Sequence, residues 1–230
     1  MSSSDKSVAE TKRLNDDLEK RLYEFVSNCD DGKGDASACH SYGEWLAVVD
    51  KKYGEAAAVY KKNCDTKNYA ASCFNYGRLL IAGKGVEMDD FQAKAALEKA
   101  CNGGHIHGCH HLGLMYLNAL GGEKDISKGI EAIDKACAAG EGGSCFRLGS
   151  MYLTSQSKYG LSRDVVKAKA YLELSCDANY APACHNLAVM YKTGDAGVPK
   201  DDDLFHKYSL KTKALAEQNS GGVAGGLKVA

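Results

Sequence analysis

The chain has 230 residues, with 29 basic and 30 acidic side chains and a formal net charge of -1. Because the two signs are interspersed, the sequence lacks the basic stripe of a protein that binds nucleic acid or anionic lipid. Its apolar runs are far shorter than the roughly 18 residues of a membrane span, so we expect no helix to cross a bilayer. Only 2 prolines stand against 25 glycines, and the alternating pattern of strands is missing, which favours helices.

The N-terminal residues 1–7 are polar and without periodicity, and we expect them to form a disordered tail. They have neither the apolar centre of a secretory signal nor the Arg-rich amphipathic character of a mitochondrial presequence. Residues 8–29 are predicted to form a single unpaired helix that ends at Cys29. This helix starts a helical array.

A motif then recurs five times at a spacing of about 35 residues, which is typical of helical repeats. Each copy opens on a cysteine, with Tyr or Leu at position four and Leu or Tyr at position eight, the spacing of one helix face. Position five is glycine in four copies and Ala188 in the last, although glycine costs about 1 kcal/mol inside a helix. We therefore predict that a second helix approaches closely here, which a side chain larger than a methyl would block. The openings are CHSYGEWL at Cys39, CFNYGRLL at Cys73, CHHLGLMY at Cys109, CFRLGSMY at Cys145 and CHNLAVMY at Cys184.

The second half of each copy supplies that helix. It begins near Asp89, Asp125 and Asp164 in three copies, and aspartate caps helix N-termini. A small residue eight positions before its final cysteine and a large apolar residue four positions before it lie on one face. Glycine-rich stretches at 83–85, 121–122 and 194–197 separate the two helices and predict turns. The final cysteines are Cys64, Cys101, Cys137 and Cys176.

The ten cysteines fall into five close pairs, in which one member ends a helix and the other begins the next. Antiparallel helices joined by a short connection bring such positions within disulfide distance. Seven to nine residues intervene within each pair, whereas zinc knuckles usually have two to four, so a cysteine-only zinc site is disfavoured. We predict five disulfides: Cys29–Cys39, Cys64–Cys73, Cys101–Cys109, Cys137–Cys145 and Cys176–Cys184.

These patterns predict an all-α protein, an α/α superhelix (solenoid) of five disulfide-linked repeats and about ten helices over residues 8–217. Residues 218–230 are Gly/Ala-rich and predict a second disordered tail. Because cytosolic thiols stay reduced, we expect the protein to mature in an oxidising compartment. The mitochondrial intermembrane space fits a disulfide-rich chain without a visible signal, and secretion or the periplasm is the alternative for a bacterial source or a trimmed signal.

The openings C-x-x-[LY]-G-x-[ML]-[YL], the turn glycines and the Ala-Cys helix ends resemble Sel-1-like repeats of the cysteine-rich, Hcp-like family, over roughly residues 25–215. Three departures are a shorter first repeat, an extra loop at Ser155–Tyr159 and Ala188 in place of glycine. The resemblance implies a mitochondrial intermembrane-space scaffold that supports respiratory-chain assembly, chiefly of cytochrome c oxidase (complex IV). It implies protein partners, namely complex IV assembly components and the oxidative import relay of that compartment.

Some bacterial members of this family were described as β-lactamase-like, so serine-enzyme motifs are relevant. Ser155-Gln156-Ser157-Lys158 and Ser3-Ser4-Asp5-Lys6 fit S-x-x-K, and Lys192-Thr193-Gly194 fits K-T-G. These short matches arise by chance, no Ser-Asp-Asn accompanies them, and they fall in a loop, a tail and a turn. We therefore expect no catalytic residues, and a β-lactamase-like hydrolase is the less favoured alternative. Redox catalysis is disfavoured because Cys-x-x-Cys is absent.

A haem- or metal-handling role is the other alternative. Histidine and methionine are haem ligands, but His111 and Met115 lie four apart on one helix and cannot approach iron from opposite sides. Met151 and Met190 share the position of Met115 in the next two repeats. The simpler interpretation is that these methionines belong to the core, so we expect neither a metal nor a cofactor.

Function then depends on a concave surface that the first helices line. We expect positions two and three of each repeat to face this groove, since they lie beside the buried positions one and four. The candidates are His40, Ser41, Phe74, Asn75, His110, His111, Phe146, Arg147, His185 and Asn186.

Overall fold

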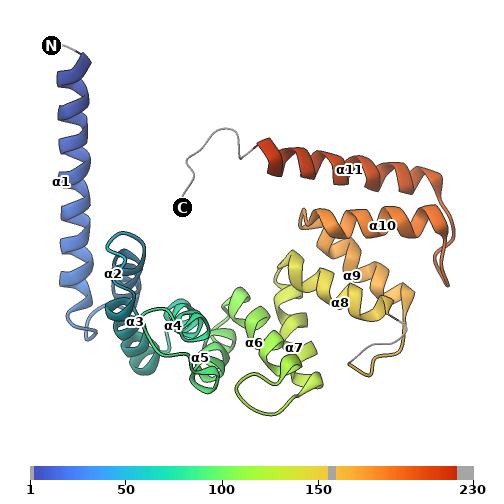
Figure 1. The fold of residues 1–230 in the computed structure, drawn as a ribbon, viewed down its shortest axis with the longest axis horizontal. Coiled ribbons are helices and arrows are strands. Elements are labelled where there is room, and N and C mark those ends of the chain that lie inside the picture. The colour runs from blue at the N-terminus through green and yellow to red at the C-terminus, as the bar shows by residue number, and fades with distance from the viewer. Residues whose placement is uncertain (1–2, 155–158, 222–230) are drawn as a thin grey trace. The chain divides into compact units, whose positions relative to one another are not determined.

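The computed structural model describes residues 3–154 and 159–221, and within these the side chains of residues 12–154 and 159–218. The described residues form eleven helices (Figure 1), and none of these helices is long and apolar enough to span a membrane. The prediction of an all-α fold is confirmed. The helices are α1 (Ser3–Cys29), α2 (Ala36–Val48), α3 (Tyr53–Lys67), α4 (Ala70–Ala82), α5 (Asp90–Asn102), α6 (Ile106–Asn118), α7 (Ile126–Ala138), α8 (Gly142–Leu153), α9 (Val165–Asp177), α10 (Ala181–Thr193) and α11 (Asp202–Gly221).

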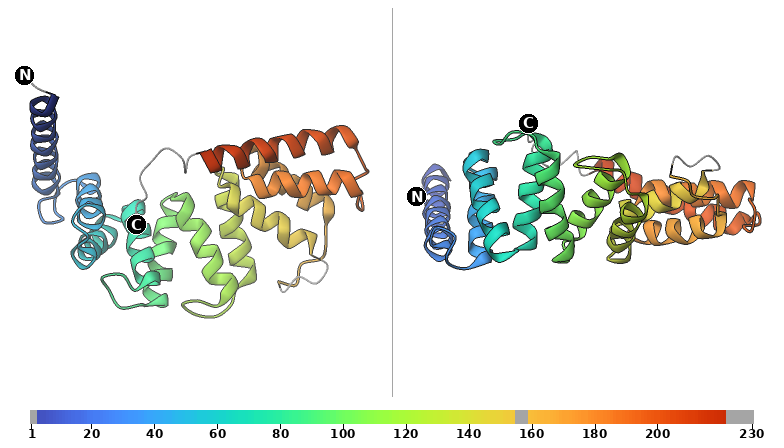
Figure 2. Two further views of the ribbon diagram at one scale, coloured as in Figure 1. Left: turned by 45° about the horizontal axis from the view of Figure 1, so that its top comes forward. Right: turned by 90° about the horizontal axis from the view of Figure 1, so that it is seen from below.

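The chain divides into two compact units. The N-terminal unit comprises residues 1–108 and 120–122, and the C-terminal unit comprises 109–119 and 123–230. Within each unit a helix packs against its neighbours in sequence, such as α2 on α3, α3 on α4 and α8 on α9. The antiparallel pairs are visible in Figure 2. We call the first helix of each pair the A helix (α2, α4, α6, α8, α10) and the second the B helix (α3, α5, α7, α9, α11).

Aspartates begin the B helices as the sequence predicts. Asp89, Asp125 and Asp164 each accept a hydrogen bond from the backbone N–H three residues ahead, at 2.8 to 2.9 Å. Asp201 does the same at the start of α11. Each bond satisfies an amide that the helix leaves without a partner. In the first repeat Lys52 stands before α3 and makes no side-chain capping hydrogen bond.

The A and B helices of a pair approach most closely at the glycine in position five. A Cβ added to Gly77 would lie 3.0 Å from Leu97 Cγ, and one added to Gly149 would lie 2.9 Å from Leu172 Cγ. At Gly113 the distance to Ile133 Cγ1 would be 2.4 Å. The predicted close approach is confirmed, and it is tighter than predicted, because even a methyl group does not fit.

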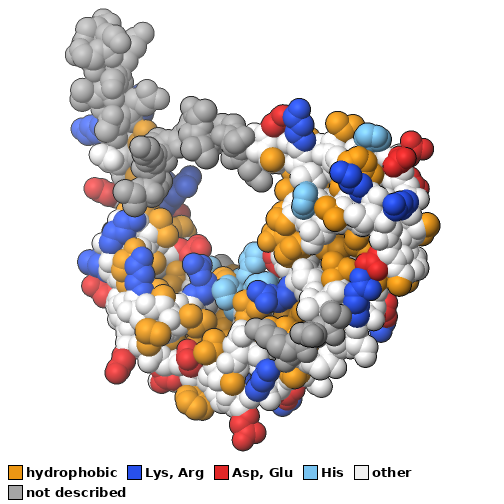
Figure 3. Space-filling model, turned by 45° about the vertical axis from the view of Figure 1, so that its right-hand side comes forward, with side chains coloured by type: hydrophobic (Ala, Val, Ile, Leu, Met, Phe, Trp, Pro, Cys, Tyr) orange, Lys and Arg blue, Asp and Glu red, His pale blue; other side chains and the backbone are white. Residues whose placement is uncertain are grey.

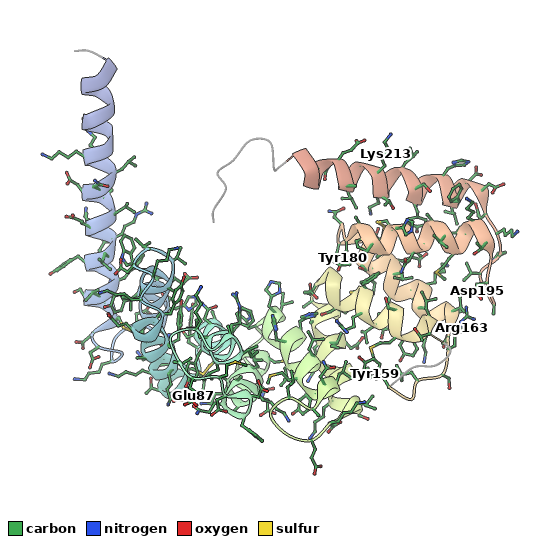
Figure 4. All side chains as sticks on the ribbon, viewed as in Figure 1. Glu87, Tyr159, Arg163, Tyr180, Asp195 and Lys213 are labelled. Atoms are coloured by element: carbon green, nitrogen blue, oxygen red, sulfur yellow. A yellow bond between two sulfur atoms is a disulfide. The ribbon has the colours of Figure 1, made fainter. Side chains whose placement is uncertain are left out.

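The fifth pair replaces this contact. Counting from the capping aspartate, Leu172 stands eight residues after Asp164, and the same step from Asp201 reaches Ser209. In the structure Ala188 shares a core cluster with Tyr208 and Leu215 of α11, whereas Ser209 is only half-buried, so this pair packs differently from the others. Four residues further along α11, Lys213 stands where the other B helices carry their cysteine. Its side chain is exposed (Figure 4).

The cysteines are oxidised in the neighbour-only pattern that the sequence predicts. The bridges join α1 and the B helices α3, α7 and α9 to the A helix that follows each, with Cα–Cα distances of 4.5 to 4.8 Å, and no described cysteine is free. Cys101 and Cys109 are also disulfide-bonded. Each loop of 8 to 10 residues contributes about 2.5 kcal/mol in the chain-entropy model. The four bridges with measured geometry are Cys29–Cys39, Cys64–Cys73, Cys137–Cys145 and Cys176–Cys184.

Both ends of the helical array extend further than expected. α1 already begins at Ser3, within the predicted tail 1–7, and α11 continues to Gly221, within the predicted tail 218–230. The sequence predicts tails there because apolar periodicity is missing, but no Gly or Pro between Ser3 and Cys29 interrupts the helix. The remaining tail residues and Ser155–Lys158 lie outside the described part of the chain.

We expect Gly149→Ala to destabilise the protein by about 1 kcal/mol, because overpacking costs about 1–3 kcal/mol and exceeds the gain in helix propensity. Chemical denaturation of this variant, of Leu172→Ala and of the double variant would measure the coupling. In the Leu172→Ala background the added methyl has space, so its cost should disappear. An equal cost in both backgrounds would show that Leu172 is not the obstacle.

Peptide mapping without reductant should link Cys137 to Cys145 and never Cys109 to Cys137. Replacing Cys137 and Cys145 together by serine should lower the free energy of unfolding by about 2–5 kcal/mol. The reduced wild type should be less stable than the oxidised double-serine variant, because reduction removes every bridge whereas the substitutions remove only one. Native protein with ten free thiols would contradict the disulfide assignment.

Candidate functional site

Each unit carries a pocket on its A helices. In the N-terminal unit a pocket of about 340 Å³ lies between α2 and α4. In the C-terminal unit a pocket of about 480 Å³ lies along α10, next to the end of α8. The first is lined by Glu44, Ala47, Val48, Lys51, Tyr53, Tyr60, Asn75, Arg78, Leu79, Ala82 and Lys84, and the second by Leu153, Arg163, His185, Asn186, Val189, Met190, Thr193 and Asp195.

The two pockets use the same face of the A helix. With the opening cysteine as position one, α4 lines its pocket with positions three, six, seven and ten, from Asn75 to Ala82. α10 uses these positions as well, from Asn186 to Thr193, and adds His185 at position two. This spacing marks one stripe along a helix. We call each pocket an A-helix groove.

The residues that the sequence predicts to line the groove have different surroundings at position three and at position two. Asn75 and Asn186, both at position three, line a groove. Ser41, His111 and Arg147 occupy the same register on other A helices and are half-buried. Position three therefore lines a pocket in both units, and its role in binding a partner stays a prediction.

Position two lies elsewhere in the N-terminal unit. The His40 ring packs against Tyr69, and its Nδ1 lies 3.1 Å from Ser72 Oγ. Phe74 is buried, only 8% exposed, and stacks on His105 with ring centroids 4.2 Å apart. Both side chains thus contact the start of the next repeat. His40 also lies beside two groove residues, with its ring centroid 5.6 Å from that of Tyr60 and its Nε2 3.6 Å from Glu44 Oε1.

The C-terminal unit repeats this arrangement. His110 Nδ1 lies 2.7 Å from Ser144 Oγ and 3.3 Å from Glu141 Oε2, and Phe146 packs against Tyr180. Burial raises the pKa of Glu141, but hydrogen bonds from Ser144 and the nearby His110 outweigh it, so this pKa lies below its ordinary value. We call these second-position contacts the repeat junctions. Side chains at successive positions of a helix point about 100° apart, so positions two and three face different surroundings.

A buried amide belongs to the first junction and has no signal in the sequence. Asn63 Nδ2 donates to Ala36 O and to Ser72 Oγ, both at 2.8 Å. Its Oδ1 is buried without a partner among the described residues. Burial lowers the pKa of His40, opposed by the charge of Glu44, so the imidazole is neutral at neutral pH. The network joins two repeats through neutral groups.

The serine, histidine and glutamate of the second junction do not form a catalytic relay. Ser144 and Glu141 both face Nδ1 of His110, whereas a triad needs the acid and the nucleophile on opposite ring nitrogens. Ser144 is also completely buried. Of the serine-enzyme motifs, Ser155–Lys158 lies outside the described residues, and Lys192-Thr193-Gly194 forms the end of α10 and its cap.

The methionines considered as haem ligands lie in the hydrophobic core. Met115, Met151 and Met190 are 2%, 5% and 6% exposed, and Met190 also reaches the groove of its unit. His111 is half-buried, with its ring at an edge-to-face angle to His110. No group of three or more metal-ligating side chains occurs in the part of the chain that the structure describes.

Three comparisons with known proteins bear on these repeats. The Sel1 repeat family model matches residues 70–105, 106–141, 143–180 and 181–204, which is more than half of the chain. The first repeat, which carries Cys39, lies outside these matches. The crystal structure of a protective antigen with an SLR fold, present in uropathogenic Escherichia coli, is similar at a TM-score of 0.69 and 25% identity. The match covers 82% of this chain and 39% of the antigen chain. A Sel1 repeat protein from Oxalobacter formigenes covers 78% of this chain and 71% of its own, at a TM-score of 0.68 and 20% identity.

The curated relatives carry one functional name. The "Cytochrome c oxidase assembly factor 7 homolog" of Drosophila melanogaster is 35% identical over 88 residues, 37% of this chain and 33% of the fly protein. The "Cytochrome c oxidase assembly factor 7A" of Xenopus laevis is 37% identical over 100 residues, 40% of this chain and 42% of the frog protein. The chain thus spans well under half the length of these relatives. Its repeats, its helix pairs and its disulfides agree with the resemblance seen in the sequence, and the chain belongs to the Sel1 repeat family.

Proposed function

We propose that this protein is a disulfide-stabilised scaffold that supports assembly of mitochondrial respiratory-chain complexes, chiefly cytochrome c oxidase. The names of the curated relatives support this role. In this proposal the chain holds protein partners in its A-helix grooves, and these partners include assembly components of complex IV. No step of the role requires catalysis.

The observation that carries the proposal is that A helices of each unit line a pocket, while other side chains of the A helices contact the next repeat. Junction residues such as His40, Phe74 and His110 are occupied by contacts within the protein. Groove residues such as Asn75 and Asn186 line space that the described residues leave open. Polar groups in an apolar groove orient a bound segment. A partner therefore has the same face of successive A helices to contact.

We place the protein in the mitochondrial intermembrane space. Five disulfides require an oxidising compartment, since cytosolic thiols are kept reduced. The oxidative import relay of that space is then the partner that forms the bridges. Oxidation would fold the chain and retain it, because each repeat buries its apolar face only against its neighbours.

Removing the protein from its cells should lower the amount of assembled complex IV while other mitochondrial proteins stay normal. Native gels and oxidase activity would measure this. Reintroducing Asn75→Ala/Asn186→Ala should give an abundant, oxidised protein that does not restore complex IV, because one groove contact is lost in each unit. Full rescue by this variant would show that the grooves are not the working surface.

The matched control changes the junctions. His40→Ala/His110→Ala should lower the abundance of the protein, because buried hydrogen bonds are lost at about 1–3 kcal/mol each. Its rescue of complex IV should fall only in proportion to its abundance. An abundant junction variant without rescue would place the binding surface at position two after all.

Protease protection should show the protein inside an intact outer membrane, with its cysteines oxidised at steady state. Opening the outer membrane by swelling should expose it to protease, because the intermembrane space is then accessible. Protection that persists after swelling would place the protein in the matrix and contradict the compartment.

A further inference from the structure

The groove of the N-terminal unit carries an excess of positive charge. Three cations line it, Lys51, Arg78 and Lys84, against one carboxylate, Glu44. Glu44 Oε1 lies 3.6 Å from His40 Nε2, whereas none of the three cations forms an ion pair with a carboxylate of the described residues. Lys84 and Arg78 lie over aromatic rings instead. Their charges are therefore available to a ligand.

The equivalent groove of the C-terminal unit is balanced. Its cation, Arg163, forms an ion pair with Asp195, and Figure 4 shows the two side chains next to each other. The Arg163 guanidinium also donates to Leu153 O at 3.0 Å. The positive excess is thus a property of one groove and not of the repeat. Elsewhere the two signs are interspersed, as on the face in Figure 3.

Lys51 occupies a backbone position that favours glycine. Its φ is 59°, in the left-handed region that side chains with a Cβ disfavour. In later repeats, the turns between A and B helices reach positive φ at glycines such as Gly83, Gly121 and Gly194, and once at Ala119. At this turn the chain carries a lysine at the edge of the groove in spite of the backbone cost. Such outliers gather at functional sites.

The rest of the groove suits a peptide. Ala47, Val48 and Leu79 form apolar walls, and Asn75 hydrogen-bonds the phenol of Tyr60, whose pKa burial raises to about 12. Asn75 can also bond a peptide group, and Arg78 can hold a carboxylate through paired N–H donors. Nucleic acid fits poorly, because the chain lacks an extended basic surface.

We propose that the groove between α2 and α4 binds an extended acidic protein segment, with its carboxylates at Lys51, Arg78 and Lys84 and an apolar side chain against Leu79. This inference rests on the proposed function, because it names the class of partner that the scaffold holds. It assigns the N-terminal groove to a carboxylate-rich segment and the C-terminal groove to a less charged one.

Fluorescence anisotropy on the intact, oxidised protein tests this assignment. The probe is a labelled peptide in which glutamate alternates with leucine, and the comparison is the same peptide with glutamine for glutamate. We expect the glutamate peptide to bind roughly tenfold more tightly, and to weaken as salt screens the charges. Equal affinity for the two peptides would overturn the proposal. Displacement of the glutamate peptide by inorganic phosphate at equal concentration would also overturn it, by showing a simple anion site.

Two variants locate the binding and separate it from folding. Lys51→Gly should weaken the glutamate peptide while the melting temperature stays equal or rises, because glycine removes the left-handed backbone cost. Arg78→Gln should weaken it as well. The control Lys12→Gln/Arg13→Gln removes two positive charges from α1 and should leave affinity unchanged. The proposed site would be contradicted if the double variant Lys51→Gly/Arg78→Gln bound the glutamate peptide as tightly as the wild type. An equal loss of affinity in the control variant would also contradict it. This assay contains no respiratory complex, so its failure and a failed complex IV rescue remain distinguishable.

Discussion

The close approach of two helices at one glycine organises each repeat. A helix without a Cβ at position five lets its partner come so near that Leu97, Ile133 and Leu172 lie where a methyl group would stand. That contact aligns the A helix against the B helix, and the alignment in turn sets which A-helix positions face the core. Positions one and four turn inward, and position three lies on the groove side. Position seven is buried in three repeats, at Met115, Met151 and Met190. In the fifth pair Ala188 replaces the glycine and shares a core cluster with Tyr208 and Leu215 of α11.

Most of the fold could be predicted because it depends on local, repeated patterns. Periodicity, capping aspartates and the spacing of the cysteines depend on contacts between neighbours in sequence, so the helix pairs and the bridges follow from them. For the candidate site, the local patterns do not distinguish position two from position three. Positions two and three are adjacent on the helix, and which of them meets the next repeat depends on where that repeat begins, a distance no single motif encodes. The partner of Asn63 and the left-handed backbone of Lys51 also depend on contacts between repeats.

Two adjacent positions of an A helix have different contacts, since position two meets the next repeat at a junction and position three lines a groove. The junction residues link one repeat to the next through neutral hydrogen bonds and stacked rings, as at His40 and Phe74. The groove residues are then free to differ between repeats without changing the link. The cations of the N-terminal groove and the Arg163–Asp195 pair of the C-terminal groove show such a difference on a common framework.

The position of the disulfides has a consequence for how the chain responds to cutting. Each bridge spans the loop that leads into an A helix, for example the loop between Cys176 of α9 and Cys184 of α10. The backbone within that loop and the bridge are two parallel covalent connections. A protease that nicks the loop therefore leaves both fragments attached to each other. Tension applied along the chain also passes through the bridge and leaves the loop slack, so the bridged loops carry little mechanical load.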